Sequence, residues 1–202
     1  MEVASMQQTA QALRQGAPAI FPTDTVYGLG VAVEYAESPE ALYALKGREA
    51  RKPIAWLVGG VEALDAYGCS VPAYAYAAAR TFWPGPLTLV VKASEAVPAA
   101  YASAEGTIGL RMPASETALK LIEAVGCPLS TTSANPSGAP APYNVASVDE
   151  ALAAQVGAVL ADSAAKSGVA STIVDCTGPA PRILREGGVS AAQMSQICSM
   201  AF

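Results

Sequence analysis

The basic run at residues 46–52 is the densest group of cationic side chains in the sequence. Four of its seven residues are Lys46, Arg48, Arg51 and Lys52. Guanidinium groups donate forked hydrogen bonds and ammonium groups act as point charges, so the two together suit a polyphosphate. The run lies between an expected helix and an expected strand, where a loop can fold over a ligand. A solvated surface loop is the alternative interpretation of the same charges.

Two segments rich in hydroxyl groups follow or end expected strands. Residues 22–30 read PTDTVYGLG, and residues 130–138 read STTSANPSG, in which six of nine residues carry a hydroxyl or an amide. Ligands of open α/β sheets bind beyond the strand ends, and hydroxyls and amides suit phosphate, carboxylate or ribose groups. The alternatives are an ordinary capped turn for the first segment and a low-complexity loop for the second.

Polar residues also stand at the ends of other apolar segments. Arg111 ends a strand that is otherwise apolar, where a charge usually has a partner or a ligand. STIVD at 171–175 and LREG at 184–187 place polar groups in the same way, and WPGP at 83–86 predicts a stiff turn anchored by an indole. Neither a Walker A motif nor a G-x-G-x-x-G motif is present, so a nucleotide would bind through neither of these cradles.

Composition narrows the class of protein. The chain has 202 residues, of which 52% are hydrophobic and 14% charged, which predicts one domain with a sizeable core. It has no histidine, which excludes Ser–His–Asp triads and zinc sites that need imidazole. The net charge of −5 argues against tight non-specific binding to nucleic acid or anionic membrane. Four cysteines without a CxxC pair predict buried free thiols.

Apolar periodicity and turn residues predict the elements that would position these groups. Strands are expected at Ala17–Phe21, Ile54–Val58, Leu87–Lys92, Thr107–Arg111, Pro128–Thr132, Ala158–Ala161, Ser171–Asp175 and Pro181–Leu184. Helices are expected at 3–15, 38–45, 72–82, 115–125, 149–156 and 190–200, with a polar turn at 23–30 and a Pro-rich loop at 133–146. Because strands and helices mix irregularly, the fold class is α/β or α+β, with one twisted mixed sheet.

Taken in order, these segments resemble the YrdC family, the threonylcarbamoyl-AMP synthases of tRNA modification. The resemblance spans about residues 20–187 and rests on PTDTVYGLG at 22–30, KGR at 46–48 with Lys52-Pro53, WPGPLT at 83–88, LRMP at 110–113, STTSANPSG at 130–138, STIVD at 171–175 and ILREG at 183–187. Each motif alone is modest, but seven in one order make a specific match. The resemblance implies a twisted sheet with a large concave basic groove.

The resemblance also implies roles for individual residues. Lys46, Arg48, Ser133 and Asn135 match the KxR and SxN tetrad of the family, which is associated with the nucleotide phosphates and is expected to be catalytic. Lys52, Thr107 and Arg185 fall at further nucleotide-contacting positions. Thr23, Arg111, Thr131 and Ser171 fall where the family holds L-threonine.

The implied reaction combines L-threonine, bicarbonate and ATP, with Mg²⁺ on the phosphates, into L-threonylcarbamoyl-adenylate and pyrophosphate. A downstream tRNA threonylcarbamoyl-transferase complex would use the product at tRNA position 37, with weak or indirect tRNA contact. The alternative is a related protein that acts as an RNA- or ribosome-binding module or as a carbamoyl-transfer module. The length predicts the short form over 1–202 without a separate C-terminal domain. The chain shows no signal peptide and no run of about 18 apolar residues, so we expect a cytoplasmic protein that does not span a membrane.

Overall fold

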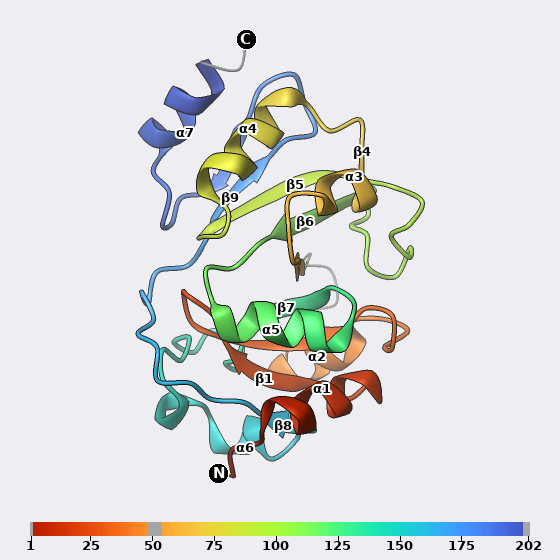
Figure 1. Ribbon diagram of the computed structural model, residues 1–202, viewed down its shortest axis with the longest axis vertical. Coiled ribbons are helices and arrows are strands. Elements are labelled where there is room, and N and C mark those ends of the chain that lie inside the picture. Colours follow the sequence, from red (N-terminus) through yellow and green to blue (C-terminus); the bar gives the residue numbers. More distant parts are fainter. Residues whose placement is uncertain (1, 48–53, 200–202) are drawn as a thin grey trace.

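The computed structural model describes residues 2–47 and 54–199. Within these residues ten strands form one sheet in the order β10-β9-β5-β6-β3-β7-β2-β1-β8, and β4 pairs with β5 beside this row. The strands are β1 (Ala19–Pro22), β2 (Tyr27–Ala32), β3 (Ala55–Leu57), β4 (Gly68–Cys69), β5 (Leu87–Ala93), β6 (Thr107–Arg111), β7 (Leu129–Ser133), β8 (Ala158–Val159), β9 (Thr172–Asp175) and β10 (Arg182–Arg185). Pairs β1·β8, β3·β6 and β5·β9 are parallel and β2·β7 is antiparallel, so the predicted twisted mixed sheet flanked by helices is confirmed (Figure 1).

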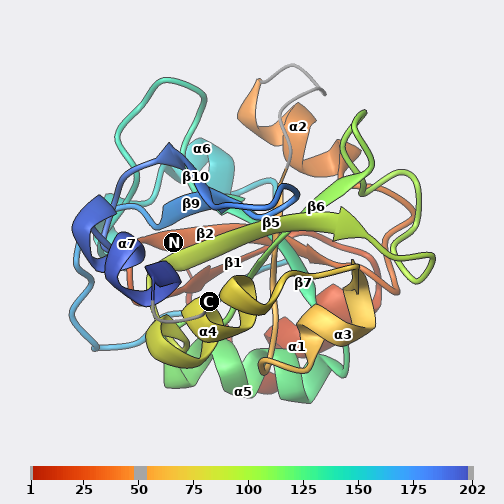
Figure 2. The ribbon, with the colours of Figure 1, turned by 90° about the horizontal axis from the view of Figure 1, so that it is seen from above.

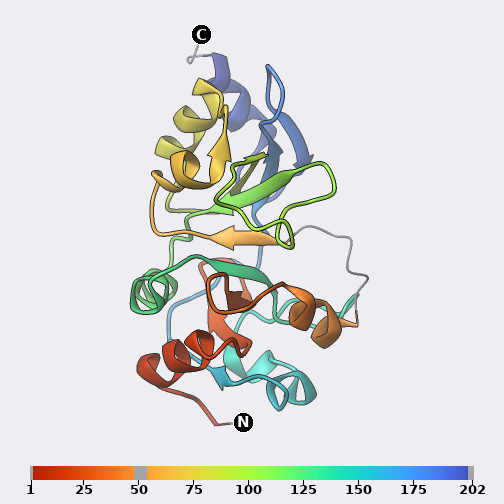
Figure 3. The same ribbon diagram turned by 90° about the vertical axis from the view of Figure 1, so that its right-hand side faces the viewer.

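Helices cover the two faces of the sheet unequally. They are α1 (Met6–Arg14), α2 (Glu40–Lys46), α3 (Ala63–Tyr67), α4 (Ala73–Phe82), α5 (Glu116–Val125), α6 (Glu150–Ala153) and α7 (Ala191–Ser199). Helices α1, α3, α4 and α5 lie on one side of the sheet, and α2 lies on the other (Figure 2). Seen from the side, β3 lies between the half with β5 and β6 and the half with β1 and β2 (Figure 3). No helix of the described residues is long and apolar enough to cross a bilayer.

Helix α5 shows how local signals fix an element. Ser115 caps its first turn by accepting a hydrogen bond from the backbone N–H of Ala118, and Gly126 ends it in the left-handed conformation. Leu121 and Ile122 lie on its buried face. The helix therefore begins and ends as expected, because its starting signal, Ser115, and its ending signal, Gly126, both act locally.

The expected turn at 23–30 is wrong in its second half. Tyr27–Ala32 forms β2, a strand buried along its whole length between β1 and β7. Its two glycines allow side chains of the neighbouring strands to approach the backbone closely. A Cβ on Gly28 would lie 2.7 Å from Cγ2 of Thr131, and one on Gly30 would lie 3.0 Å from the Phe21 ring. Sequence patterns interpret glycine as a turn residue, whereas here it allows close packing across the sheet.

We expect Gly28→Ala to lower the free energy of unfolding by about 1–3 kcal/mol, because the added methyl overpacks the contact with Thr131. Chemical denaturation measures the change. The matched rescue is Gly28→Ala with Thr131→Ser, which removes the opposing Cγ2 and should recover much of the loss. Equal stability of Gly28→Ala and the unmodified protein would show that the close approach is not constraining.

Helix α1 begins later than the expected 3–15. Ser5 accepts from the N–H of Gln8, and the Gln8 side chain accepts from the N–H of Ser5, which forms a capping box. The residues before this box pair with the sheet instead, because the N–H of Ala4 donates to the carbonyl of Val159 at 2.8 Å. The cap, rather than the apolar spacing that begins at Val3, therefore sets the start of the helix.

Candidate functional site

A polar cleft of about 370 Å³ is lined by residues of β2, β3, β5, β6, β7, β9 and β10 and of the loops beside them. On β3, Ala55 and Leu57 line this cleft, whereas Trp56 between them packs edge-on against Tyr67 and Tyr101. The alternation of a strand thus separates the core from the cleft. Six of the predicted site residues line it, namely Thr23, Arg111, Thr131, Ser133, Ser171 and Arg185.

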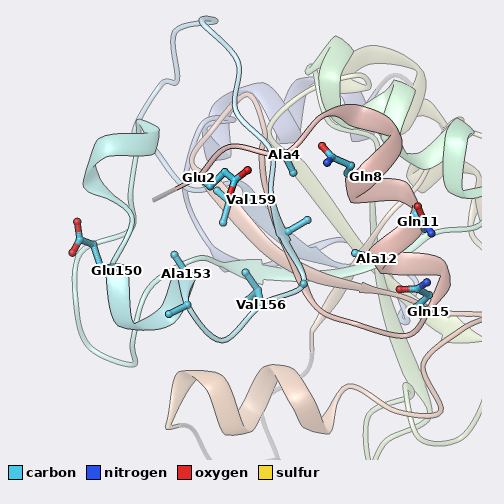
Figure 4. Close-up of a pocket in the computed structure, with 13 residues that line it drawn as sticks. Glu2, Ala4, Gln8, Gln11, Ala12, Gln15, Glu150, Ala153, Val156 and Val159 are labelled. Atoms are coloured by element: carbon cyan, nitrogen blue, oxygen red, sulfur yellow. The ribbon is translucent and has the colours of Figure 1, made fainter.

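A second and larger hollow lies between α1, α6 and β8 (Figure 4). Its rim carries the amides of Gln8, Gln11 and Gln15 with two carboxylates, Glu2 and Glu150. It contains none of the predicted site residues and no cationic side chain. The polar cleft, which holds two arginines, is therefore the candidate site for an anionic substrate.

Arg111 lies at the end of β6 and is almost fully buried, with 7% of its surface exposed. Its guanidinium donates from Nε to the carbonyl of Gly85 at 3.0 Å, from Nη1 to Oγ1 of Thr25 at 3.1 Å and from Nη2 to Oδ1 of Asp24 at 2.6 Å. Burial lowers the pKa of Arg111, and the charge and hydrogen bond of Asp24 oppose that shift. An arginine stays protonated under such conditions, so the cleft keeps a fixed cation here.

Arg185 supplies a second cation from β10. Its Nε and Nη2 donate to the carbonyl of Ser171 at 3.1 and 2.8 Å, and Nη2 also reaches Oγ of Ser171 at 3.3 Å. That serine oxygen lies 2.9 Å from Oγ1 of Thr88. Burial lowers the pKa of Arg185, and the charge of Arg111 lowers it further. Arg185 is thus a second guanidinium group that lines the cleft.

The loop before β2 is tied together by threonine hydroxyls. Oγ1 of Thr23 donates to the carbonyl of Val26 at 2.6 Å, and it lies 3.0 Å from Oγ1 of Thr25. Because Thr23 has one hydroxyl hydrogen, Thr25 is the donor between the two. Its oxygen in turn accepts from Arg111. The hydroxyl hydrogen of Thr23 is therefore already used, so Thr23 could contact a bound threonine only as a hydrogen-bond acceptor.

Lys46 joins the end of α2 to the segment after β7. Its Nζ donates to the carbonyls of Ser133 and Asn135 at 2.5 and 2.6 Å, with Oδ1 of Asn135 at 3.3 Å. The amide of Asn135 donates to the carbonyl of Ala139 at 2.7 Å, which shapes the Pro-rich loop. Three members of the predicted tetrad are therefore brought together, and the fourth, Arg48, lies outside the described residues.

The remaining predicted residues fall in different places. Thr131 lines the cleft and donates its hydroxyl to the carbonyl of Leu129 at 2.9 Å, which leaves its oxygen free to accept. Thr107 begins β6, about 13 Å along the strand from Arg111, and its Oγ1 lies 2.8 Å from Oγ of Ser103. The structure does not bring Thr107 into the cleft. Lys52 lies outside the described residues.

Three residues of the site were not assigned individual roles from the sequence. Asp24 and Thr25 hold Arg111, and Thr88 lies against Ser171 inside the cleft. All three belong to motifs that were recognised, PTDT and WPGPLT, but the motifs do not show which side chains meet. The partner of a buried arginine is the signal that could have directed attention to Asp24.

The fold and the cleft define an α/β protein with one mixed sheet and a polar cleft that two arginines line. The Sua5/YciO/YrdC family model, described as telomere recombination, matches residues 11–187, so the chain belongs to that family. Relatives named threonylcarbamoyl-AMP synthase include one from Pyrococcus abyssi, 36% identical over 92% of this chain, and one from Halorhodospira halophila, 32% identical over 77%. The chain spans 54% of the first relative and 81% of the second.

Among solved structures, P. abyssi Sua5 complexed with L-threonine superposes with a TM-score of 0.89 and 35% identity. The match covers 95% of this chain and 56% of that one. The predicted family is therefore confirmed.

Proposed function

We propose that this chain is a threonylcarbamoyl-AMP synthase. The observation that carries the proposal is the polar cleft, in which two arginines and several hydroxyls converge in a chain of this family. The amine of L-threonine adds to bicarbonate with loss of water to form a carbamate. A carbamate oxygen then attacks the α-phosphorus of ATP, and pyrophosphate leaves. The related Sua5 from P. abyssi is described in complex with L-threonine, which supports the amino acid as substrate.

The chemistry needs placement and charge neutralisation more than a covalent nucleophile, which agrees with a chain without histidine. In this proposal Lys46, Ser133, Asn135 and Arg185 act on the nucleotide, and Arg111 acts on the carboxylate. The contacts of Arg48, Lys52 and Thr107 with the nucleotide stay predictions. Mg²⁺ arrives bound to the phosphates of ATP, as part of the substrate.

The amino-acid part of the site is assigned to Arg111, Thr131, Ser171 and Thr23. Arg111 ends β6, Ser171 directly precedes β9 and Thr131 lies on β7, and all three line the cleft. A forked guanidinium suits the carboxylate. The neutral hydroxyls suit the hydroxyl and amine of threonine.

Thr131→Val is expected to raise the KM for L-threonine several-fold, about 3- to 10-fold, and to leave the KM for ATP nearly unchanged. The reason is that valine keeps the volume but removes the oxygen that accepts in the cleft. Steady-state kinetics with each substrate varied in turn measures the two values. An unchanged threonine dependence would remove Thr131 from the amino-acid site.

The product is handed to a tRNA threonylcarbamoyl-transferase complex for position 37 of tRNA, and direct tRNA contact is weak or indirect. A cytoplasmic location stays a prediction.

The alternative, a module that binds RNA or transfers carbamoyl groups, is not favoured, because the relatives at 30% identity or more carry the synthase name.

The test of the proposal is direct detection of the product. The protein is incubated with ATP, Mg²⁺, L-threonine and ¹⁴C-bicarbonate, and the adenylate is separated by chromatography and identified by mass spectrometry. Label in a species with the mass of threonylcarbamoyl-adenylate is the expected result. ATP binding without any labelled adenylate would contradict the proposal and favour a different use of the cleft.

A further inference from the structure

Three acceptors support the guanidinium of Arg111, namely the carbonyl of Gly85, the hydroxyl of Thr25 and the carboxylate of Asp24. Gly85 and Asp24 are not among the residues that line the cleft, whereas Arg111 and Thr25 are. The carboxylate of Asp24 pairs with Nη2 at 2.6 Å, and 14% of that side chain is exposed. The backbone of this support is fixed as well, because the N–H groups of Ser167 and Gly168 donate to the carbonyls of Asp24 and Thr25 at 3.0 and 2.9 Å.

A count of donors shows what this support leaves available. An arginine has five N–H donors, one on Nε and two on each terminal nitrogen. Three are used, one each by Gly85, Thr25 and Asp24. One donor therefore remains on Nη1 and one on Nη2. A carboxylate that is bound end-on by arginine uses one donor from each of these nitrogens.

The ion pair between Asp24 and Arg111 makes the two arginines of the cleft electrostatically different. Asp24 forms an ion pair with Arg111, whereas Arg185 takes part in no ion pair within residues 2–47 and 54–199. Because its charge is balanced by Asp24, Arg111 offers directed hydrogen bonds but little net electrostatic attraction. Arg185 keeps an unbalanced positive charge, which suits the more highly charged of the two proposed substrates, ATP.

We propose that Asp24 is a positioning residue, which orients the guanidinium of Arg111 so that its two remaining donors receive the carboxylate of the amino-acid substrate. The inference rests on the proposed function and deepens it. Asp24 acts through Arg111, so its removal should weaken amino-acid binding and spare the nucleotide. Thr25 and the carbonyl of Gly85 complete the same support.

The first experiment compares Asp24→Asn with the unmodified protein by calorimetric titration of L-threonine and of ATP. We expect the Kd for L-threonine to rise about tenfold or more, because a charge-assisted hydrogen bond is lost, and the Kd for ATP to change less than about twofold. The matched control is Asp175→Asn. Asp175 also pairs with an arginine, Arg182, at 2.8 Å and is 15% exposed, but it lies outside the cleft. This control should lower thermal stability and leave L-threonine affinity unchanged.

A double-mutant cycle with Arg111→Lys tests whether Asp24 acts through the arginine. If it does, the double variant should bind L-threonine about as weakly as Arg111→Lys alone. Losses that multiply would overturn the inference. If Asp24→Asn does not fold, Thr25→Val and Thr25→Ser give the same test. The valine removes the acceptor for Nη1 and should weaken L-threonine binding, whereas the serine keeps that acceptor and should restore it.

Measurements on the wild-type protein distinguish a failure of the role of Asp24 from a failure of the proposed function. Label in the adenylate together with unchanged L-threonine affinity in Asp24→Asn would overturn the inference alone. Absence of both L-threonine binding and adenylate in the wild-type protein would overturn the proposed function and the inference with it.

Discussion

Lys46→Ala is expected to lower the rate of pyrophosphate release by about 100- to 1000-fold. The substitution removes a positive charge that the proposed function assigns to the phosphates of ATP. It also releases the carbonyls of Ser133 and Asn135, which Lys46 Nζ holds at 2.5 and 2.6 Å. Both effects act on the same three members of the tetrad, so the loss exceeds that of an ordinary surface lysine. Steady-state assays at saturating substrates measure it.

Two controls make the Lys46 result interpretable. Lys46→Met keeps most of the side-chain volume, so a comparable loss in this variant would show that charge and hydrogen bonding matter rather than packing. Lys120→Ala removes an exposed lysine that pairs with Glu116 on α5, and it should leave the rate unchanged. A Lys46→Ala rate within about threefold of wild type, with the fold intact by circular dichroism, would remove Lys46 from the active site.

Arg111→Lys is expected to raise the KM for L-threonine about 100-fold, because lysine keeps the charge but loses the planar fork. It also abandons the carbonyl of Gly85 and the hydroxyl of Thr25, which Arg111 satisfies in the wild-type protein. The KM for ATP should change little, since the proposed function assigns Arg185 and Lys46 to the nucleotide. Varying each substrate at saturating levels of the others measures the split. Equal losses for both substrates would place Arg111 at the nucleotide instead.

Elements whose signals are local were predictable from the sequence. Helix α5 has its cap at Ser115 and its end at Gly126 within one short stretch, and β6 is an apolar run that ends in Arg111. The residues that line the cleft were also found largely from motifs. A spacing of more than 80 residues separates Arg111 from Asp24, yet both lie in conspicuous segments.

Features that depend on distant neighbours were not predictable. The glycines of β2 indicate a turn until Thr131 and Phe21 are placed beside them. Helix α3 and strand β4, at 63–69, were not expected, because the segment is too short to show a period. Lys46 was interpreted as a loop cation, whereas it is 5% exposed and points to the end of β7. For Gly28 and for Lys46, the deciding contact joins residues far apart in the chain, Thr131 and Ser133 respectively.

The measurement that tests the central claim most directly is pyrophosphate release from ATP and Mg²⁺, with L-threonine and bicarbonate omitted in turn. The account predicts release only when both are present, and none when Mg²⁺ is withheld. Release that is independent of L-threonine, or ATP binding without any release, would contradict the assignment of the cleft to threonylcarbamoyl-adenylate synthesis.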